Sequence, residues 1–153
     1  MSKEYEIVIP DESFVLVDSE EDGLPAKIKV NENLLAFEPK LIFGWHLSIQ
    51  FTLQALDENG LPTAEESEAL SDYEEFLNEN ITGPKVKPNG LYVGSVTWNR
   101  RRELMFLVHD PEVADKFLKF VCERNDTPRG LHYEMEHDPE WGKAMGYLQL
   151  LGQ

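Results

Sequence analysis

The chain has 153 residues, of which 41% are hydrophobic and 28% are charged, as expected for one soluble globular domain. It carries 29 acidic and 14 basic side chains, and this formal charge of −15 argues against unaided binding to nucleic acid or to anionic membranes. A single cysteine excludes an internal disulfide and a metal cage built from cysteines. No stretch has the pattern of a signal peptide or a membrane span, so we expect a cytoplasmic protein.

The first 44 residues are predicted to form an extension built from strands. Residues 5–9 alternate between apolar and polar side chains and predict a short strand. Two β-prone runs around an acidic turn predict a β-hairpin over residues 14–30. Within residues 32–44, three apolar side chains are expected to cover one end of the core: Leu34, Leu35 and Phe37.

The next segment begins with the clearest strand and helix patterns in the chain. From Trp45 to Ala55 every second side chain is apolar, which predicts a strand with one buried face. Thr63 followed by Glu66 has the spacing of a capping box, and apolar residues at helical spacing follow it. These patterns predict an amphipathic helix over residues 64–80.

The remaining elements complete an α+β fold. A hairpin is predicted over residues 91–109, a helix over 111–124 and a strand over 130–137. The resulting order is the βαββαβ order of the ferredoxin-like fold, an antiparallel sheet with both helices on one face. The whole chain is therefore expected to be a single domain over 1–153, divided into the extension 1–44, the core 45–137 and a C-terminal helix in 138–153.

Several motifs of this chain resemble those of a bacterial family. They are Gly60-Leu61-Pro62-Thr63 with Glu65-Glu66, Gly94-Ser95-Val96-Thr97 leading to Arg102-Glu103, and Tyr133 with Asp138-Pro139-Glu140-Trp141. From about Trp45 to Leu151, the chain resembles the domain-of-unknown-function family 695. That family has no established activity, so the resemblance implies no catalytic residue.

A second resemblance rests on charge, size and element order. The chain is distantly similar to the bacterial ribonuclease E inhibitor called regulator of ribonuclease activity B. This similarity implies a ribonuclease-regulator-like function as one alternative.

The uneven distribution of charge suggests a partner surface. Residues 1–83 contain 19 acidic and 4 basic side chains, whereas residues 84–153 contain 10 of each. The simplest interpretation is a solvated acidic surface that keeps the protein soluble. The alternative is a surface for a basic protein partner, with these candidate residues: Glu20, Glu21, Asp22, Glu68, Asp72, Glu75 and Glu79.

A polar face of the predicted sheet is the candidate ligand site. In the ferredoxin-like order, the strand from Gly130 lies antiparallel to the strand from Trp45, with polar residues on their uncovered side. That side would hold His46, Gln50, His132, Glu134 and Glu136. Plain cross-strand pairing in solvent is the simpler interpretation. The alternative is a ligand or partner face, as in an enzyme or a metal-binding protein that uses the His/Glu cluster.

Two further motifs each have a structural and a functional interpretation. His-Asp-Pro-Glu occurs twice, and we expect Asp110 and Asp138 to accept backbone N–H groups at helix starts rather than to bind a metal. Arg100, Arg101 and Arg102 form the basic run at a hairpin tip. They are expected to be solvated or paired with the protein's own acids, the alternative being an anion or nucleic-acid contact.

The sequence as a whole favours a non-catalytic interaction or regulatory module that binds a basic protein. It identifies no catalytic residue, no metal site and no cofactor, and it makes nucleic-acid binding unlikely in view of the net charge of −15. The oligomeric state stays open.

Overall fold

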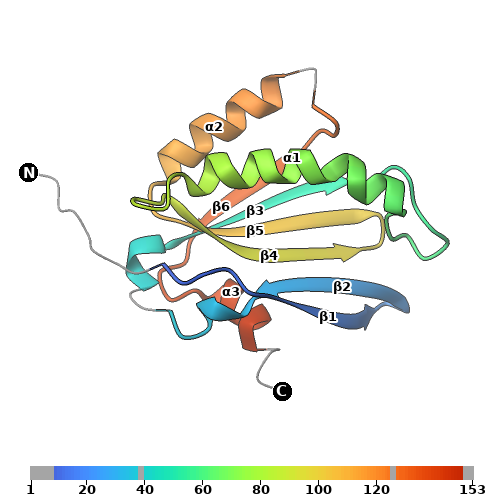
Figure 1. The fold of residues 1–153 in the computed structure, drawn as a ribbon, viewed down its shortest axis with the longest axis horizontal. Coiled ribbons are helices and arrows are strands. Elements are labelled where there is room, and N and C mark those ends of the chain that lie inside the picture. The colour runs from blue at the N-terminus through green and yellow to red at the C-terminus, as the bar shows by residue number, and fades with distance from the viewer. Residues whose placement is uncertain (1–8, 38–39, 125–126, 150–153) are drawn as a thin grey trace, which may run out of the picture.

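The computed structural model describes residues 9–37, 40–124 and 127–149, which form an α+β fold (Figure 1). Its strands are β1 (Phe14–Glu21), β2 (Leu24–Asn31), β3 (Trp45–Thr52), β4 (Gly90–Trp98), β5 (Arg101–Val108) and β6 (His132–His137). Its α-helices are α1 (Ala64–Thr82), α2 (Pro111–Glu123) and α3 (Gly142–Leu148). Short 3-10 helices span Glu32–Leu34 and Lys40–Phe43. The strand predicted over residues 5–9 falls almost entirely outside the described residues.

The strands form one antiparallel sheet in the order β1-β2-β4-β5-β3-β6. The predicted hairpin over residues 14–30 is confirmed by the pairing of β1 with β2. The predicted antiparallel contact between the strand from Trp45 and the later strand is also confirmed, since Ile49 lies opposite Tyr133. The α+β class is therefore confirmed for the described residues.

Helices α1 and α2 cover one face of the sheet, as Figure 1 shows. The apolar residues that alternate along β3 pack there against the stripe of α1, because both periodicities direct their apolar side chains to the same layer. The buried residues of this cluster include Leu47, Ile49, Phe51, Leu53, Leu70, Tyr73, Leu77 and Val121. Phe117 of α2 is only partly buried and packs against the cluster.

The opposite face carries a second apolar cluster beneath α3 and the two 3-10 helices (Figure 1). Leu34 and Phe37 are buried in it, whereas Leu35 is 39% exposed, so the prediction for Leu35 is wrong. Trp141 is fully buried, stacks on Phe37 with ring centroids 5.5 Å apart, and donates its indole N–H to the carbonyl of Phe43 at 2.9 Å. This side chain fixes α3 to the segment that precedes β3.

The two predicted aspartates each lie shortly before the start of a helix. Asp110 accepts the backbone N–H of Glu112 at 3.0 Å, and Asp138 accepts those of Gly142 and Lys143, each at 3.0 Å. Both aspartates therefore accept N–H groups at a helix start, as expected. Trp141, however, occupies the N-cap position of α3, so Asp138 binds the first turn from outside the helix.

The capping box predicted at the start of α1 is only half formed. Thr63 accepts the backbone N–H of Glu66 at 3.2 Å. The carboxylate of Glu66 does not return to the N–H of Thr63, which bonds the carbonyl of Ala55. It instead accepts the backbone N–H groups of Gln54 and Ala55 and pairs with Arg129. Glu66 thus joins three segments that are distant in sequence.

Replacing Phe51 by alanine is expected to lower the free energy of unfolding by about 3 kcal/mol, the lower end for a buried phenylalanine. The ring packs against Tyr73 with centroids 5.9 Å apart, and 4% of the residue remains exposed. Urea denaturation monitored by circular dichroism measures the change. Leu16→Ala is the control, because Leu16 is 78% exposed and its replacement should cost under about 0.5 kcal/mol. A loss below about 1 kcal/mol for Phe51→Ala would place that ring outside the core.

Candidate functional site

A groove of about 930 Å³ lies between α3 and the strands β3, β5 and β6. We call it the α3 groove. It is lined by His46, Ser48, Gln50, Glu103, Met105, Glu134, Met135, Glu136, Gly142, Lys143, Gly146 and Tyr147. Four of the five residues predicted as a ligand face are in this set, and His132 is not.

The strand register explains why these polar side chains meet. His46 lies opposite Glu136 and Gln50 lies opposite His132, so the even-numbered residues of β3 and β6 share one face. Strand β5 adds Glu103, which lies opposite Gln50 on the other side of β3. Residues far apart in sequence are therefore brought together by two antiparallel pairings.

The expectation that this face is uncovered is wrong around His46. Helix α3 lies over the face, and His46 is only 4% exposed. Ser48 is also buried, and its hydroxyl donates to the carboxylate of Glu103 while it accepts from Gln50 Nε2 at 3.5 Å. The floor of the groove is thus a buried polar surface rather than a solvated sheet.

His46 has an unusual environment for a buried histidine. Its Nδ1 is buried and has no hydrogen-bond partner among the residues that the structure describes. Burial and the nearby ammonium of Lys143 lower the pKa of His46 below the ordinary 6.5, against the opposing effect of carboxylates such as Glu103 and Glu136. The imidazole is consequently neutral at pH 7.

The rim of the groove carries both signs of charge. Lys143 Nζ lies 2.5 Å from Glu136 Oε2, and this hydrogen bond raises the pKa of Lys143. Glu134 Oε1 lies 3.3 Å from His132 Nε2, at the exposed edge of β6. With three carboxylates against one ammonium, the groove is negative overall.

The sequence did not single out the groove residues of β5 and α3. Glu103 could have been assigned to the groove from the register of β3 and β5. The sequence alone does not give that register, because it depends on the geometry of the whole β4–β5 hairpin. Lys143 and Tyr147 are four residues apart and so share one face of α3. The placement of α3 over the sheet depends on Trp141, which no local pattern indicates.

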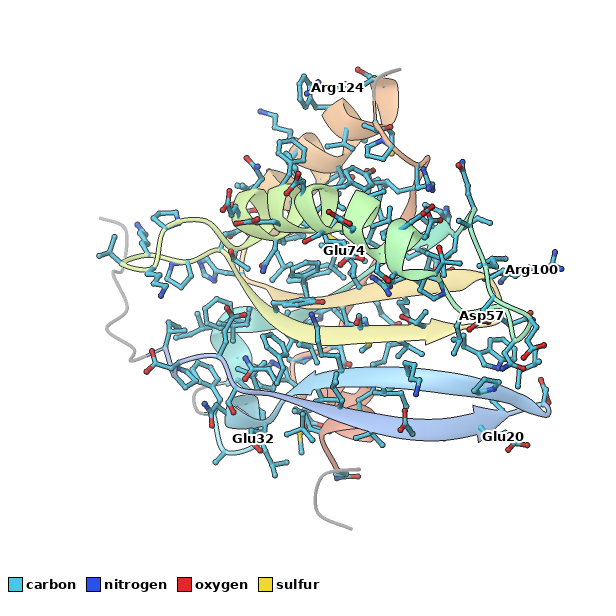
Figure 2. The ribbon with its side chains drawn as sticks, turned by 45° about the vertical axis from the view of Figure 1, so that its right-hand side comes forward. Glu20, Glu32, Asp57, Glu74, Arg100 and Arg124 are labelled. Carbon is cyan, nitrogen blue, oxygen red and sulfur yellow. The ribbon has the colours of Figure 1, made fainter. Side chains whose placement is uncertain are left out.

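The acidic partner residues lie on the hairpin tip and on α1. Glu20, Glu21 and Asp22 are exposed at the turn between β1 and β2, where Figure 2 labels Glu20. Helix α1 presents an exposed stripe formed by Glu68, Asp72, Glu75 and Glu79. The two sets belong to different elements and do not form one cluster.

A second cavity, of about 500 Å³, adjoins this stripe. We call it the α1 cleft. Its carboxylates are Asp11, Glu12, Glu75 and Glu79. Its apolar residues include Ile9, Leu34, Leu91 and Tyr92, and its one lysine is Lys85. The cleft therefore combines apolar surface with an excess of negative charge.

The three consecutive arginines lie where the turn after β4 leads into β5, with Arg100 in the turn and Arg101 and Arg102 at the start of β5. Figure 2 shows Arg100 at the end of the molecule where Asp57 also lies, and Arg100 and Arg101 are exposed. Arg102 is partly buried and pairs with Glu74 at 2.6 Å, as expected for pairing with the protein's own acids. It also donates to the hydroxyl of Thr97 at 3.0 Å.

One family model matches the chain, over residues 15–151, and it is described as a family of unknown function, DUF695. The chain belongs to this family. The match confirms the resemblance inferred from the motifs. It extends that resemblance toward the N-terminus, through the hairpin of β1 and β2 to Val15. Comparisons with curated proteins and with solved structures found no match.

Over 9–37, 40–124 and 127–149, no group of three His, Cys, Asp or Glu side chains is placed to hold a metal ion. In the same residues, no helix has the length and apolarity needed to cross a membrane.

Proposed function

We propose that this DUF695 chain is a non-catalytic interaction module that binds a basic segment of a partner protein. The observation that carries the proposal is the α1 cleft, in which carboxylates surround apolar side chains. A segment with lysine or arginine on one side and apolar residues on the other complements such a surface. The apolar contacts would provide affinity, and the carboxylates would select a cationic partner.

Long-range electrostatics support the same proposal. The stripe on α1 continues from the cleft through Glu68 and Asp72, which are exposed. Together with the net charge of −15, it would raise the rate of encounter with a cationic partner and repel phosphates. Salt should weaken the attraction, since the Debye length falls from about 10 Å at 0.1 M to about 3 Å at 1 M.

A synthetic amphipathic peptide of leucine and lysine is a suitable probe of this proposal. We expect the variant with Glu68→Gln, Asp72→Asn, Glu75→Gln and Glu79→Gln to associate with it about tenfold more slowly at low salt. Stopped-flow fluorescence measures the rate, and circular dichroism checks that the fold is intact. The matched control removes four exposed carboxylates elsewhere: Glu58→Gln, Glu112→Gln, Glu123→Gln and Glu140→Gln.

Two results would contradict the proposal. Equal slowing in both quadruple variants would show that only net charge matters and that the α1 cleft is not the binding site. Micromolar binding of single-stranded RNA at 0.15 M salt, lost when Arg100, Arg101 and Arg102 are changed to alanine, would favour a nucleic-acid contact instead.

Three finer assignments accompany this proposal. We propose that residues 45–137 form a ferredoxin-like core, which the antiparallel order β4-β5-β3-β6 supports. We propose a cytoplasmic location, which the single free cysteine, Cys122, supports. The similarity to regulator of ribonuclease activity B stays a prediction, because no curated protein matches.

A further inference from the structure

We propose that the α3 groove is a second binding site, for a primary ammonium group carried on an aliphatic chain. It lies on the opposite face of the sheet from α1 and is independent of the α1 cleft. Its ligand would be a small aliphatic diamine or a lysine side chain of a protein, which share this chemistry.

The unpaired histidine on the floor of the groove is the first argument. A buried polar group without a partner costs about 1–3 kcal/mol, and in folded proteins such groups are usually paired with protein, water or ligand. His46 lines the groove, is only 4% exposed, and its Nδ1 has no partner among the described residues. A neutral imidazole can accept a hydrogen bond from an ammonium group.

The charged side chains of the groove determine whether its ligand is a cation or an anion. Lys143 is already paired with Glu136, and among the described residues the carboxylates of Glu103 and Glu134 have no basic partner other than the exposed His132 beside Glu134. An ammonium group donates three hydrogen bonds, and carboxylates are strong acceptors for them. An anionic ligand would be repelled by the same pair.

The remaining walls suit a hydrocarbon chain. Met105 is buried and Tyr147 is partly buried along the groove. Methionine side chains adapt to flexible aliphatic groups, and an aromatic face attracts an adjacent cation. The combination of two carboxylates that no lysine or arginine of the described residues pairs with and these two side chains favours an alkylammonium ligand over a hydrated metal ion.

The methyl signal of Met105 reports binding at this site directly. The full chain, labelled with ¹³C at its methionine methyl groups, is titrated with 1,5-diaminopentane in one arm and with a blocked tripeptide containing one lysine in the other. In at least one arm we expect a saturable shift of the Met105 methyl signal, with a dissociation constant of about 1 mM or below. The Met105→Leu variant assigns this signal among those of the four methionines, and 1,5-pentanediol, which lacks the ammonium groups, should cause no saturable shift.

Charge variants then test the assigned contacts. Glu103→Gln combined with Glu134→Gln should weaken binding at least about tenfold. The control, Glu58→Gln combined with Glu123→Gln, changes the net charge equally and should keep the affinity within about twofold. The arm that saturates identifies the source of the ammonium group. Absence of saturation in both arms, or equal weakening in the two double variants, would overturn the proposal.

Discussion

Replacing Gly94 by alanine is expected to lower the free energy of unfolding by more than about 4 kcal/mol, the largest loss predicted for this chain. Gly94 has φ +151° and lies at the irregularity in the pairing of β4 with β5. A Cβ atom built there would lie 1.8 Å from the backbone carbonyl oxygen of Lys29. Because that oxygen belongs to β2, which pairs with β4, relief of the clash requires the two strands to separate.

Urea denaturation, or the yield of folded protein if the variant does not fold, measures this effect. Gly23→Ala is the control: Gly23 also has a left-handed backbone, with φ +78°, but nothing lies within 4 Å of its built Cβ. It should cost only about 1 kcal/mol. If the two variants lose similar stability, backbone strain rather than the close approach of β2 and β4 explains the role of Gly94.

Replacing Arg129 by methionine is expected to lower the free energy of unfolding by about 3–5 kcal/mol, because it leaves a buried carboxylate without its counter-ion. The side chain of Arg129 is 12% exposed and that of its partner Glu66 is 2% exposed. The backbone N–H groups of Gln54 and Ala55 would remain as donors to Glu66 but carry no net charge. Urea denaturation at pH 7 measures the loss.

A second substitution separates the unpaired charge from lost packing. Adding Glu66→Gln to Arg129→Met removes the charge, so the double variant should be more stable than Arg129→Met alone. A deficit below about 1 kcal/mol in Arg129→Met, or no recovery in the double variant, would show that the ion pair contributes little.

The same pair predicts the direction of the pH dependence. Desolvation opposes the ionisation of Glu66, but the backbone N–H of Gln54 and the guanidinium of Arg129 outweigh it and hold its pKa below the ordinary 4.5. The stabilisation from Glu66 is therefore fully present above about pH 4.5 and is lost as the pH falls through the lower pKa of the folded state. The stability difference between wild type and Glu66→Gln should shrink over that range.

The elements with strong local periodicity could be predicted from the sequence. The alternation from Trp45 and the helical spacing after Thr63 each need only neighbouring residues, and β3 and α1 form where these patterns lie. The start of α2 was equally predictable, since Asp110 and the proline after it are local signals of a helix start. These elements also fix the α+β class.

The candidate sites were less predictable because they depend on contacts between distant segments. Glu66 has the spacing of a capping residue, yet its carboxylate is used by Arg129, 63 residues later. His46 was placed correctly on a polar face, but its burial follows from α3, whose position Trp141 determines. The negative charge of the hairpin tip and of the stripe on α1 could be predicted from the sequence, whereas the α1 cleft forms only because residues 9–12 pack beside α1.

The helices that cover the two faces of the sheet differ in length, and this difference implies that the two faces differ in local stability. Helices α1 and α2 have 19 and 13 residues, whereas α3 has 7 and relies largely on Trp141, Ala144 and Leu148 for its burial. Amide hydrogens of α3 should therefore exchange through a partial opening that leaves β3 and β5 protected. Such an opening would expose His46 without unfolding the larger core, so the wall of the α3 groove can admit a ligand at a fraction of the global unfolding free energy.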